Sequence, residues 1–133
     1  MDFRQRLDTA GAEHGQGVDL EAVARAEQHV GLLPDDYRAF LVEVGWAAIG
    51  PDEVAGLGPD LPHPSRSVVE LTKRERLDGG LPGHLVAVHG DGGGNFACLY
   101  EGRVVLWVHD DPVLHELGPT FTEWLETLLE TAV

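Results

Sequence analysis

Apolar residues recur at helical spacing in two adjacent segments of the N-terminal half. The first segment follows Asp19, a residue type that caps helices, and ends at Gly31. Its apolar positions, three or four residues apart, are Leu20, Val23, Ala26 and Val30. The second segment begins near Pro34 and ends at Gly45. Its apolar positions are Tyr37, Phe40, Leu41 and Val44. The pattern therefore predicts two consecutive helices.

The segments on either side of these helices are less regular. Residues 1–18 have no clear periodicity and contain three glycines, so we expect a loose N-terminal lead-in with room for a short helix. Residues 46–64 hold short apolar runs among Gly and Pro, which indicates edge strands or extended loop. Ser65 or Ser67 is suited to cap a third helix. That helix would end in the basic cluster Lys73, Arg74 and Arg76, where cations suit a helix C-terminus.

The second half alternates short apolar runs with turn residues. Runs over 85–88, 96–100 and 104–108 predict the strands of a β-meander, and the last is nearly all apolar, as expected of a central strand. The sequence Thr-Phe-Thr-Glu at 120–123 is a capping box and begins a final helix. The apolar face of that helix is Phe121, Trp124, Leu125, Leu128 and Leu129. These elements predict an α+β fold in a single domain, with N-terminal helices, a mainly antiparallel sheet and a C-terminal helix.

Charge narrows the classes of partner. The chain has 133 residues and a formal net charge of −14, from 9 Lys and Arg against 23 Asp and Glu. That length suits one compact domain, and the charge argues against direct binding to nucleic acid or an anionic membrane, because both would be repelled. Residues 91–133 alone carry eight acids and one base. This acidity fits either a well-solvated surface or a face presented to a cationic partner.

No residue pattern indicates catalysis, a metal or a cofactor. The glycine-rich segment 90–95 leads into a predicted strand and lacks the following Lys and Ser or Thr of a phosphate loop, so we interpret it as a turn. His84, His89 and His109 stand at predicted strand ends, but no HExxH motif occurs. The single cysteine, Cys98, lies in an apolar strand and can form neither an internal disulfide nor a cysteine zinc site. The first residues lack the apolar stretch of a signal peptide, so we expect a cytoplasmic protein.

Four acids are the candidate partner-binding residues. Asp110 and Asp111 directly follow the third predicted strand, so they should stand at a sheet end beside the glycine-rich segment that contains Asp91. Glu116 follows shortly after them and completes the set. The acids of the last helix are expected to form a solvated face opposite its apolar stripe.

These segments, in this order, resemble the SUKH superfamily, which includes the Smi/Knr-type yeast cell-wall regulator domain and many bacterial immunity proteins. The similarity lies in AVARAEQHVGLLPDDYRAFL (22–41), the glycines around Trp46 and Leu57, GDGGGNFACL (90–99), VVLWVH (104–109) and the terminal helix. It covers residues 19–130, which we take as the SUKH-like domain, with 1–18 as the lead-in. The resemblance implies a non-enzymatic α+β binding domain with no shared catalytic set to transfer.

Bacterial members of that superfamily typically neutralise a cognate polymorphic toxin, often a nuclease, by binding it in the cytosol. The resemblance therefore implies a cognate toxin domain as partner, and the acidity of this chain fits a basic one. An intracellular scaffold or regulatory module unrelated to toxins is the alternative, as the yeast relatives suggest. A third hypothesis, an enzyme or small-ligand binder using His89, Asp91, His109 and Asp110, has less support from the sequence.

Overall fold

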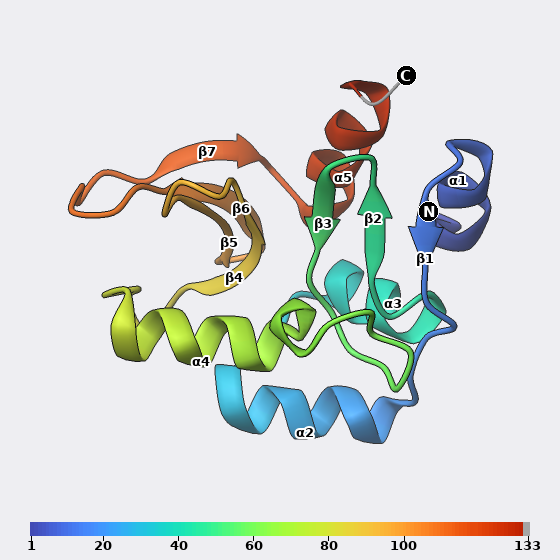
Figure 1. Ribbon diagram of the computed structural model, residues 1–133, viewed down its shortest axis with the longest axis horizontal. Coiled ribbons are helices and arrows are strands. Elements are labelled where there is room, and N and C mark those ends of the chain that lie inside the picture. The colour runs from blue at the N-terminus through green and yellow to red at the C-terminus, as the bar shows by residue number, and fades with distance from the viewer. Residues whose placement is uncertain (132–133) are drawn as a thin grey trace.

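The computed structural model describes residues 1–131 as helices packed around two antiparallel sheets (Figure 1). The helices are α1 (Phe3–Thr9), α2 (Leu20–Val30), α3 (Asp35–Glu43), the 3₁₀ helix η1 (Pro64–Arg66), α4 (Val68–Asp78) and α5 (Phe121–Thr131). The strands are β1 (Glu13–His14), β2 (Ala47–Ile49), β3 (Asp52–Val54), β4 (Val86–Gly90), β5 (Phe96–Tyr100), β6 (Arg103–Trp107) and β7 (His115–Gly118). The α+β fold class predicted from the sequence is confirmed. No helix in this described range is both long and apolar enough to cross a bilayer.

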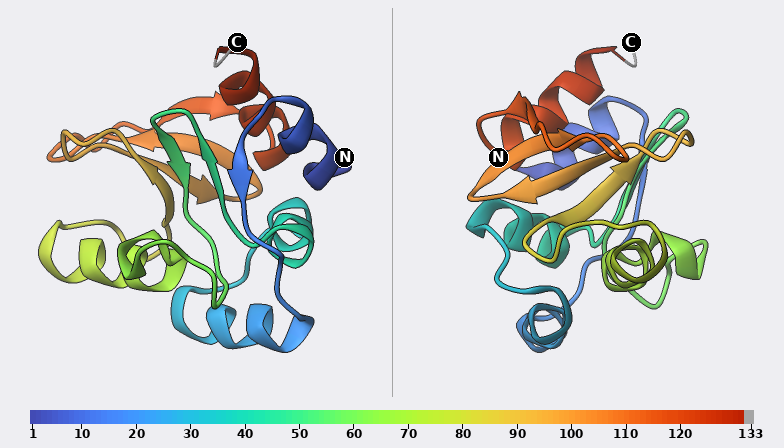
Figure 2. Two further views of the ribbon diagram at one scale, coloured as in Figure 1. Left: turned by 45° about the vertical axis from the view of Figure 1, so that its right-hand side comes forward. Right: turned by 90° about the vertical axis from the view of Figure 1, so that its left-hand side faces the viewer.

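The two sheets are joined through their neighbouring strands. One sheet has the order β1-β2-β3 and the other β4-β5-β6-β7, and all pairings are antiparallel. Directly after β3, the Ala55 amide donates to the Val88 carbonyl of β4 at 2.7 Å. The His89 ring adds a second link, with Nδ1 3.1 Å from the Glu53 carbonyl oxygen. The strands thus follow one another around a single curved surface, with β1 at one end and β7 at the other (Figure 2).

The larger sheet is covered on both faces. The register pairs Phe96 with Trp107 and Tyr100 with Arg103, so these side chains share one face. α4 packs against β4, where the Thr72 hydroxyl bonds both the amide and the carbonyl of Ala87. α5 packs against β6 and β7, on the other side of the sheet from α4 (Figure 2). Because helices lie on both faces, β6 can be apolar on both, and it is an interior strand as predicted.

An aromatic cluster at the centre of the core brings the two ends of the chain together. The rings of Phe3 and Phe40 meet edge to face with centroids 5.6 Å apart, and Phe121 stands 4.9 Å from Tyr37. All four rings are buried. Arg6 of α1 pairs with Glu126 of α5 at 2.9 Å.

The first 18 residues are therefore more regular than the loose lead-in expected from the sequence. They contain α1, which buries Phe3 and Leu7, and β1, which pairs with β2. α1 is the short helix for which the sequence left room, and periodicity did not locate it because a seven-residue helix offers only two core positions. Packing against α3 and α5, rather than local pattern, stabilises it.

Candidate partner-binding surface

Three of the four acids predicted as partner-binding residues lie in loops at one end of the larger sheet, and the fourth lies on its outer strand. We call Asp91, Asp110, Asp111 and Glu116 the acidic edge. Because Phe96 pairs with Trp107, the glycine-rich loop before β5 lies beside the end of β6, where Asp110 and Asp111 follow. Three of the four acids therefore share one end of the sheet, as the sequence predicted. Glu116 lies on β7, where it stands opposite Val105 of β6.

Asp91 organises its own loop. Its Oδ1 accepts hydrogen bonds from the amides of Gly93 at 2.7 Å and Asn95 at 3.2 Å, and its Oδ2 accepts from Asn95 Nδ2 at 3.0 Å. The bond from Gly93, supported by those from Asn95, holds the pKa of the Asp91 carboxyl below its usual range. Asp91 is exposed, so its charge faces solvent although its oxygens are used within the loop.

Asp110 and Asp111 form the tip that follows β6. Asp110 has a φ of 66° and a side chain 88% exposed, with His109 Nδ1 3.7 Å from its Oδ1. Asp111 is tied in more closely, because its Oδ1 accepts from the Val113 amide at 2.9 Å. Asp110 is thus the acid of this tip best placed to meet another molecule.

Glu116 shares a cation with the neighbouring hairpin. Its Oε1 lies 3.8 Å from Arg103, which also approaches Glu101 at 3.6 Å and stacks over the Tyr100 ring at 5.5 Å. Arg103 is the one base among residues 91–131. It offsets only part of the local negative charge, so the acidic edge as a whole stays anionic.

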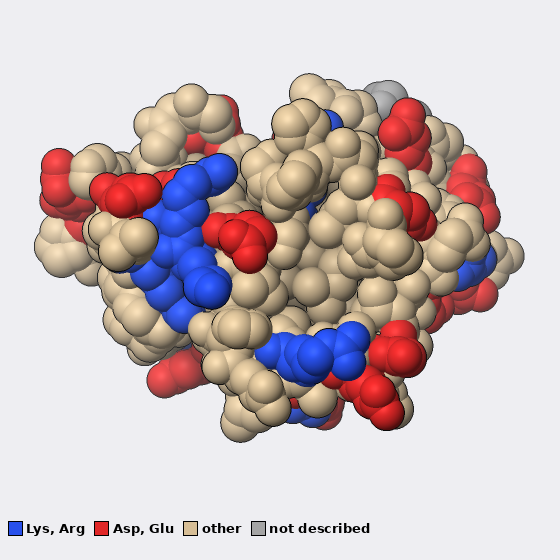
Figure 3. Space-filling view, turned by 60° about the horizontal axis from the view of Figure 1, so that its bottom comes forward, with Lys and Arg blue, Asp and Glu red and all other residues tan. Residues whose placement is uncertain are grey.

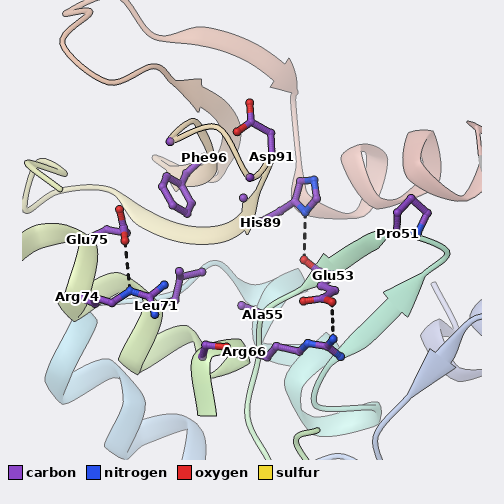
Figure 4. Close-up of a pocket in the computed structure, with 14 residues that line it drawn as sticks. Pro51, Glu53, Ala55, Arg66, Leu71, Arg74, Glu75, His89, Asp91 and Phe96 are labelled. Carbon is purple, nitrogen blue, oxygen red and sulfur yellow. Dashed lines mark hydrogen bonds and ion pairs between the residues drawn. The ribbon is translucent and has the colours of Figure 1, made fainter. Parts of the chain in front are cut away.

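A cleft, which we call the α4 cleft, adjoins the acidic edge, and the sequence did not indicate it. This space of about 580 Å³ lies between α4, the end of β3 and the glycine-rich loop (Figure 4). Each of its two arginines is paired with a carboxylate: Arg66 bonds Glu53, and Arg74 lies 3.3 Å from Glu75. Figure 4 shows the Asp91 carboxylate directed away from both arginines. Paired charges give the cleft no strong preference for ligands of one sign.

The basic cluster of α4 is divided between surface and interior. Lys and Arg side chains form a band over α4, with Asp and Glu around it (Figure 3). Lys73 and Arg74 are exposed, whereas Arg76 Nη2 donates to the carbonyls of Val30 at 2.9 Å and Leu85 at 3.0 Å. Burial lowers the pKa of Arg76. Because Val30 ends α2, this cation serves the C-terminus of a neighbouring helix rather than that of its own.

The histidines at strand ends do not converge. His84 packs on the Tyr100 ring at 5.4 Å, His89 bonds the β3 backbone, and His109 faces Asp110. Across residues 1–131, no group of three or more His, Cys, Asp or Glu side chains is placed to hold a metal ion. Burial raises the pKa of the Cys98 thiol to about 12, so the thiol is neutral at physiological pH.

Comparison with known proteins identifies the family. A family model described as SMI1-KNR4 cell-wall, of the SUKH group, matches residues 4–130. The chain belongs to the SMI1-KNR4 family of the SUKH superfamily. A crystal structure of a protein from Pseudomonas syringae pv. tomato is similar to this SUKH chain, with a TM-score of 0.70 and 21% identity over 89% of this chain and 87% of the other. That likeness shows a shared fold. Comparison with curated proteins finds no match.

Proposed function

We propose that this SUKH protein is a non-enzymatic immunity protein, which neutralises a cognate basic toxin by binding it directly in the cytoplasm. The observation that carries the proposal is the main part of the acidic edge: Asp91, Asp110 and Asp111 lie in loops at one end of the larger sheet, in a chain of net charge −14. Hydrogen bonds within these loops hold the Asp91 and Asp111 carboxylates in place before binding, so little ordering entropy is lost there when a partner docks.

The mechanism is electrostatic competition. A toxin that cleaves nucleic acid holds phosphates with Lys and Arg, and an acidic inhibitor can occupy the same cationic surface. Opposite charge also raises association rates from about 10⁵–10⁶ to as much as 10⁸–10⁹ M⁻¹s⁻¹ at low salt. Fast capture suits a protein that must bind a toxin before the toxin reaches its substrate.

The test begins with protection and continues with kinetics. Cells that express the product of the gene beside this one, the expected toxin, should survive when this protein is also expressed. In purified proteins, the double variant Asp110→Asn, Asp111→Asn should then bind that toxin more slowly and with weaker salt dependence. At position 110, Asn tolerates the positive φ. At position 111, the Asn side-chain oxygen can still accept from the Val113 amide. The variant therefore removes charge and leaves the loop conformation in place.

A matched control removes two charges elsewhere. Glu123→Gln with Glu130→Gln changes the net charge equally, on exposed positions of α5 away from the loop ends. It should change the association rate much less than the edge variant. Equal effects of the two variants would show that only overall charge matters and would reject the acidic edge as the contact. Failure to protect against the toxin would reject immunity.

A scaffold or regulatory module unrelated to toxins is the second candidate. It is supported by the cell-wall description of the matching family model and by the α4 cleft, whose paired charges suit a partner without strong net charge. A partner that depends on Arg74 and Glu75, and not on the acidic edge, would favour this function.

A further inference from the structure

We infer that the outer edge of β7 is a strand-pairing site, at which an extended segment of the basic partner adds a fifth strand to the larger sheet. This inference rests on the proposed function for the identity of the partner, and it specifies how the backbone of that partner is bound. Pairing of this kind draws affinity from main-chain hydrogen bonds, while alternate side chains provide selectivity.

The two outer strands of the larger sheet differ in what covers them. On the β4 side, the Ala55 amide occupies the Val88 carbonyl and the His89 ring contacts Glu53. On the β7 side, no backbone group of His115–Gly118 bonds any part of the described chain other than β6. His115, Glu116 and Leu117 are all exposed, and Gly118 is buried against Trp124. Three consecutive residues of β7 thus offer an accessible strand edge.

The charges beside β7 select the occupant. Glu116 lies on the strand itself, and Asp110 and Asp111 stand in the loop that leads into it. A second copy of this chain would bring these carboxylates against their own counterparts, which disfavours self-pairing. Pro112 and Pro119 also bracket the segment and keep it short, a feature that limits indiscriminate edge association. A basic segment is attracted by the same carboxylates that would repel a second copy of this chain.

The register of β7 narrows the sequence of that segment. Glu116 lies opposite Val105 and His115 lies opposite Leu106, so these two side chains project to opposite faces of the strand. The register shifts between Val104 and Val105, which leaves Leu117 without a direct partner on β6. In an antiparallel pair, directly opposed residues share a face, so the partner residue opposite Glu116 should be Lys or Arg. The expected segment places a basic residue between β-branched neighbours, which favour an extended strand.

The experiment uses the full chain and a blocked peptide that alternates valine and lysine. A second peptide has the same side chains and charge but carries N-methyl groups on its central backbone nitrogens, which prevents strand pairing. We expect the first peptide to slow amide hydrogen exchange at residues 115–117 and the methylated peptide to bind about tenfold more weakly, as the loss of one or two hydrogen bonds implies. Equal affinity for the two peptides, or no binding of either, would overturn the inference.

Charge reversal tests the selectivity. Glu116→Lys should weaken binding of the valine–lysine peptide about fivefold or more, whereas Glu123→Lys on α5 should leave it nearly unchanged. Protection against the toxin is measured separately with the wild-type chain. If protection is seen and the peptides bind equally, strand pairing fails and immunity stands. If the peptides behave as expected and no protection is seen, immunity fails and the pairing edge stands.

Discussion

Asp36, in the first turn of α3, accepts two hydrogen bonds from Thr122, which stands 86 residues later at the start of α5. Its Oδ2 lies 2.9 Å from the Thr122 amide and 3.0 Å from the Thr122 hydroxyl. Thr120 accepts from the Glu123 amide nearby, as the predicted capping box requires. An acid of one helix therefore satisfies an amide that the beginning of another helix leaves without an intrahelical partner.

Replacing Asp36 with Ala should destabilise the protein. Loss of a helix-capping acceptor costs about 1–2 kcal/mol of unfolding free energy, because the Thr122 amide and hydroxyl then lack their partner. Urea denaturation measures the change. Asp35→Ala is the matched control: it lies in the same turn of α3, but its side chain is fully exposed and pairs only with Arg38. Comparable losses for the two variants would contradict the capping role.

Removing the Tyr37 hydroxyl should lower the stability of the protein. The hydroxyl donates to the Ala55 carbonyl at 2.7 Å inside the core, and Tyr37→Phe would leave that buried carbonyl without this bond. We expect a cost of about 1–3 kcal/mol, seen as a lower thermal midpoint. Tyr100→Phe, at a half-buried position, should have little effect. Burial raises the pKa of Tyr37 well above its usual value, so the hydroxyl stays neutral. The cost of removing it should therefore be the same from about pH 6 to about pH 9.

The glycine-rich loop provides a backbone test. Gly92 and Gly94 have φ values of 82° and 92°, and a Cβ at either position would meet no neighbouring atom within 4 Å. Valine at either position should therefore destabilise the protein by about 1–3 kcal/mol through backbone strain alone. Gly93 lacks a positive φ and serves as the control. Thermal unfolding without any partner measures the effect, and unchanged stability at both Gly92 and Gly94 would refute the turn interpretation.

Asp91 should contribute stability that depends on pH. Because its pKa is lower in the folded chain than in the unfolded one, its contribution is present at pH 7 and is lost as the pH falls through the folded value. The Asp91→Asn variant should thus be less stable than the wild type at neutral pH. The difference should narrow below about pH 5, where an ordinary aspartate begins to protonate. Chemical denaturation over this pH range measures it, and a constant difference would contradict the assignment.

Several of the elements found from the sequence have long apolar patterns, whereas α4 was indicated by its capping serine. α2, α3 and α5 each present a stripe of core residues, and β6 is apolar after its first residue, so local spacing was sufficient to predict them. β7 was missed because an exposed edge strand needs no apolar alternation: three of its four residues face solvent. β2 and β3, expected as edge strands or loop, are three residues each and depend on pairing with each other.

The candidate site was accessible to sequence reasoning only in part. Strand order placed Asp91 near Asp110 and Asp111, because the acids directly adjoin predicted strands. Their different roles could not be read from spacing, since the bonds that tie Asp91 to Gly93 and Asn95 depend on the loop conformation. The α4 cleft could not be predicted either, because Glu53, Arg74 and Asp91 come from three separate segments that only the tertiary fold brings together.

The contact between the first and last helices has a consequence for synthesis of the chain. Arg6 lies 120 residues before its native neighbour Glu126, and Phe3 is similarly far from Phe121. The aromatic cluster cannot close before α5 has been synthesised, although Phe3, Tyr37 and Phe40 are made much earlier. The apolar side chains of α1 therefore stay without their last neighbours until α5 is present, and closing contacts of such long sequence separation slows folding.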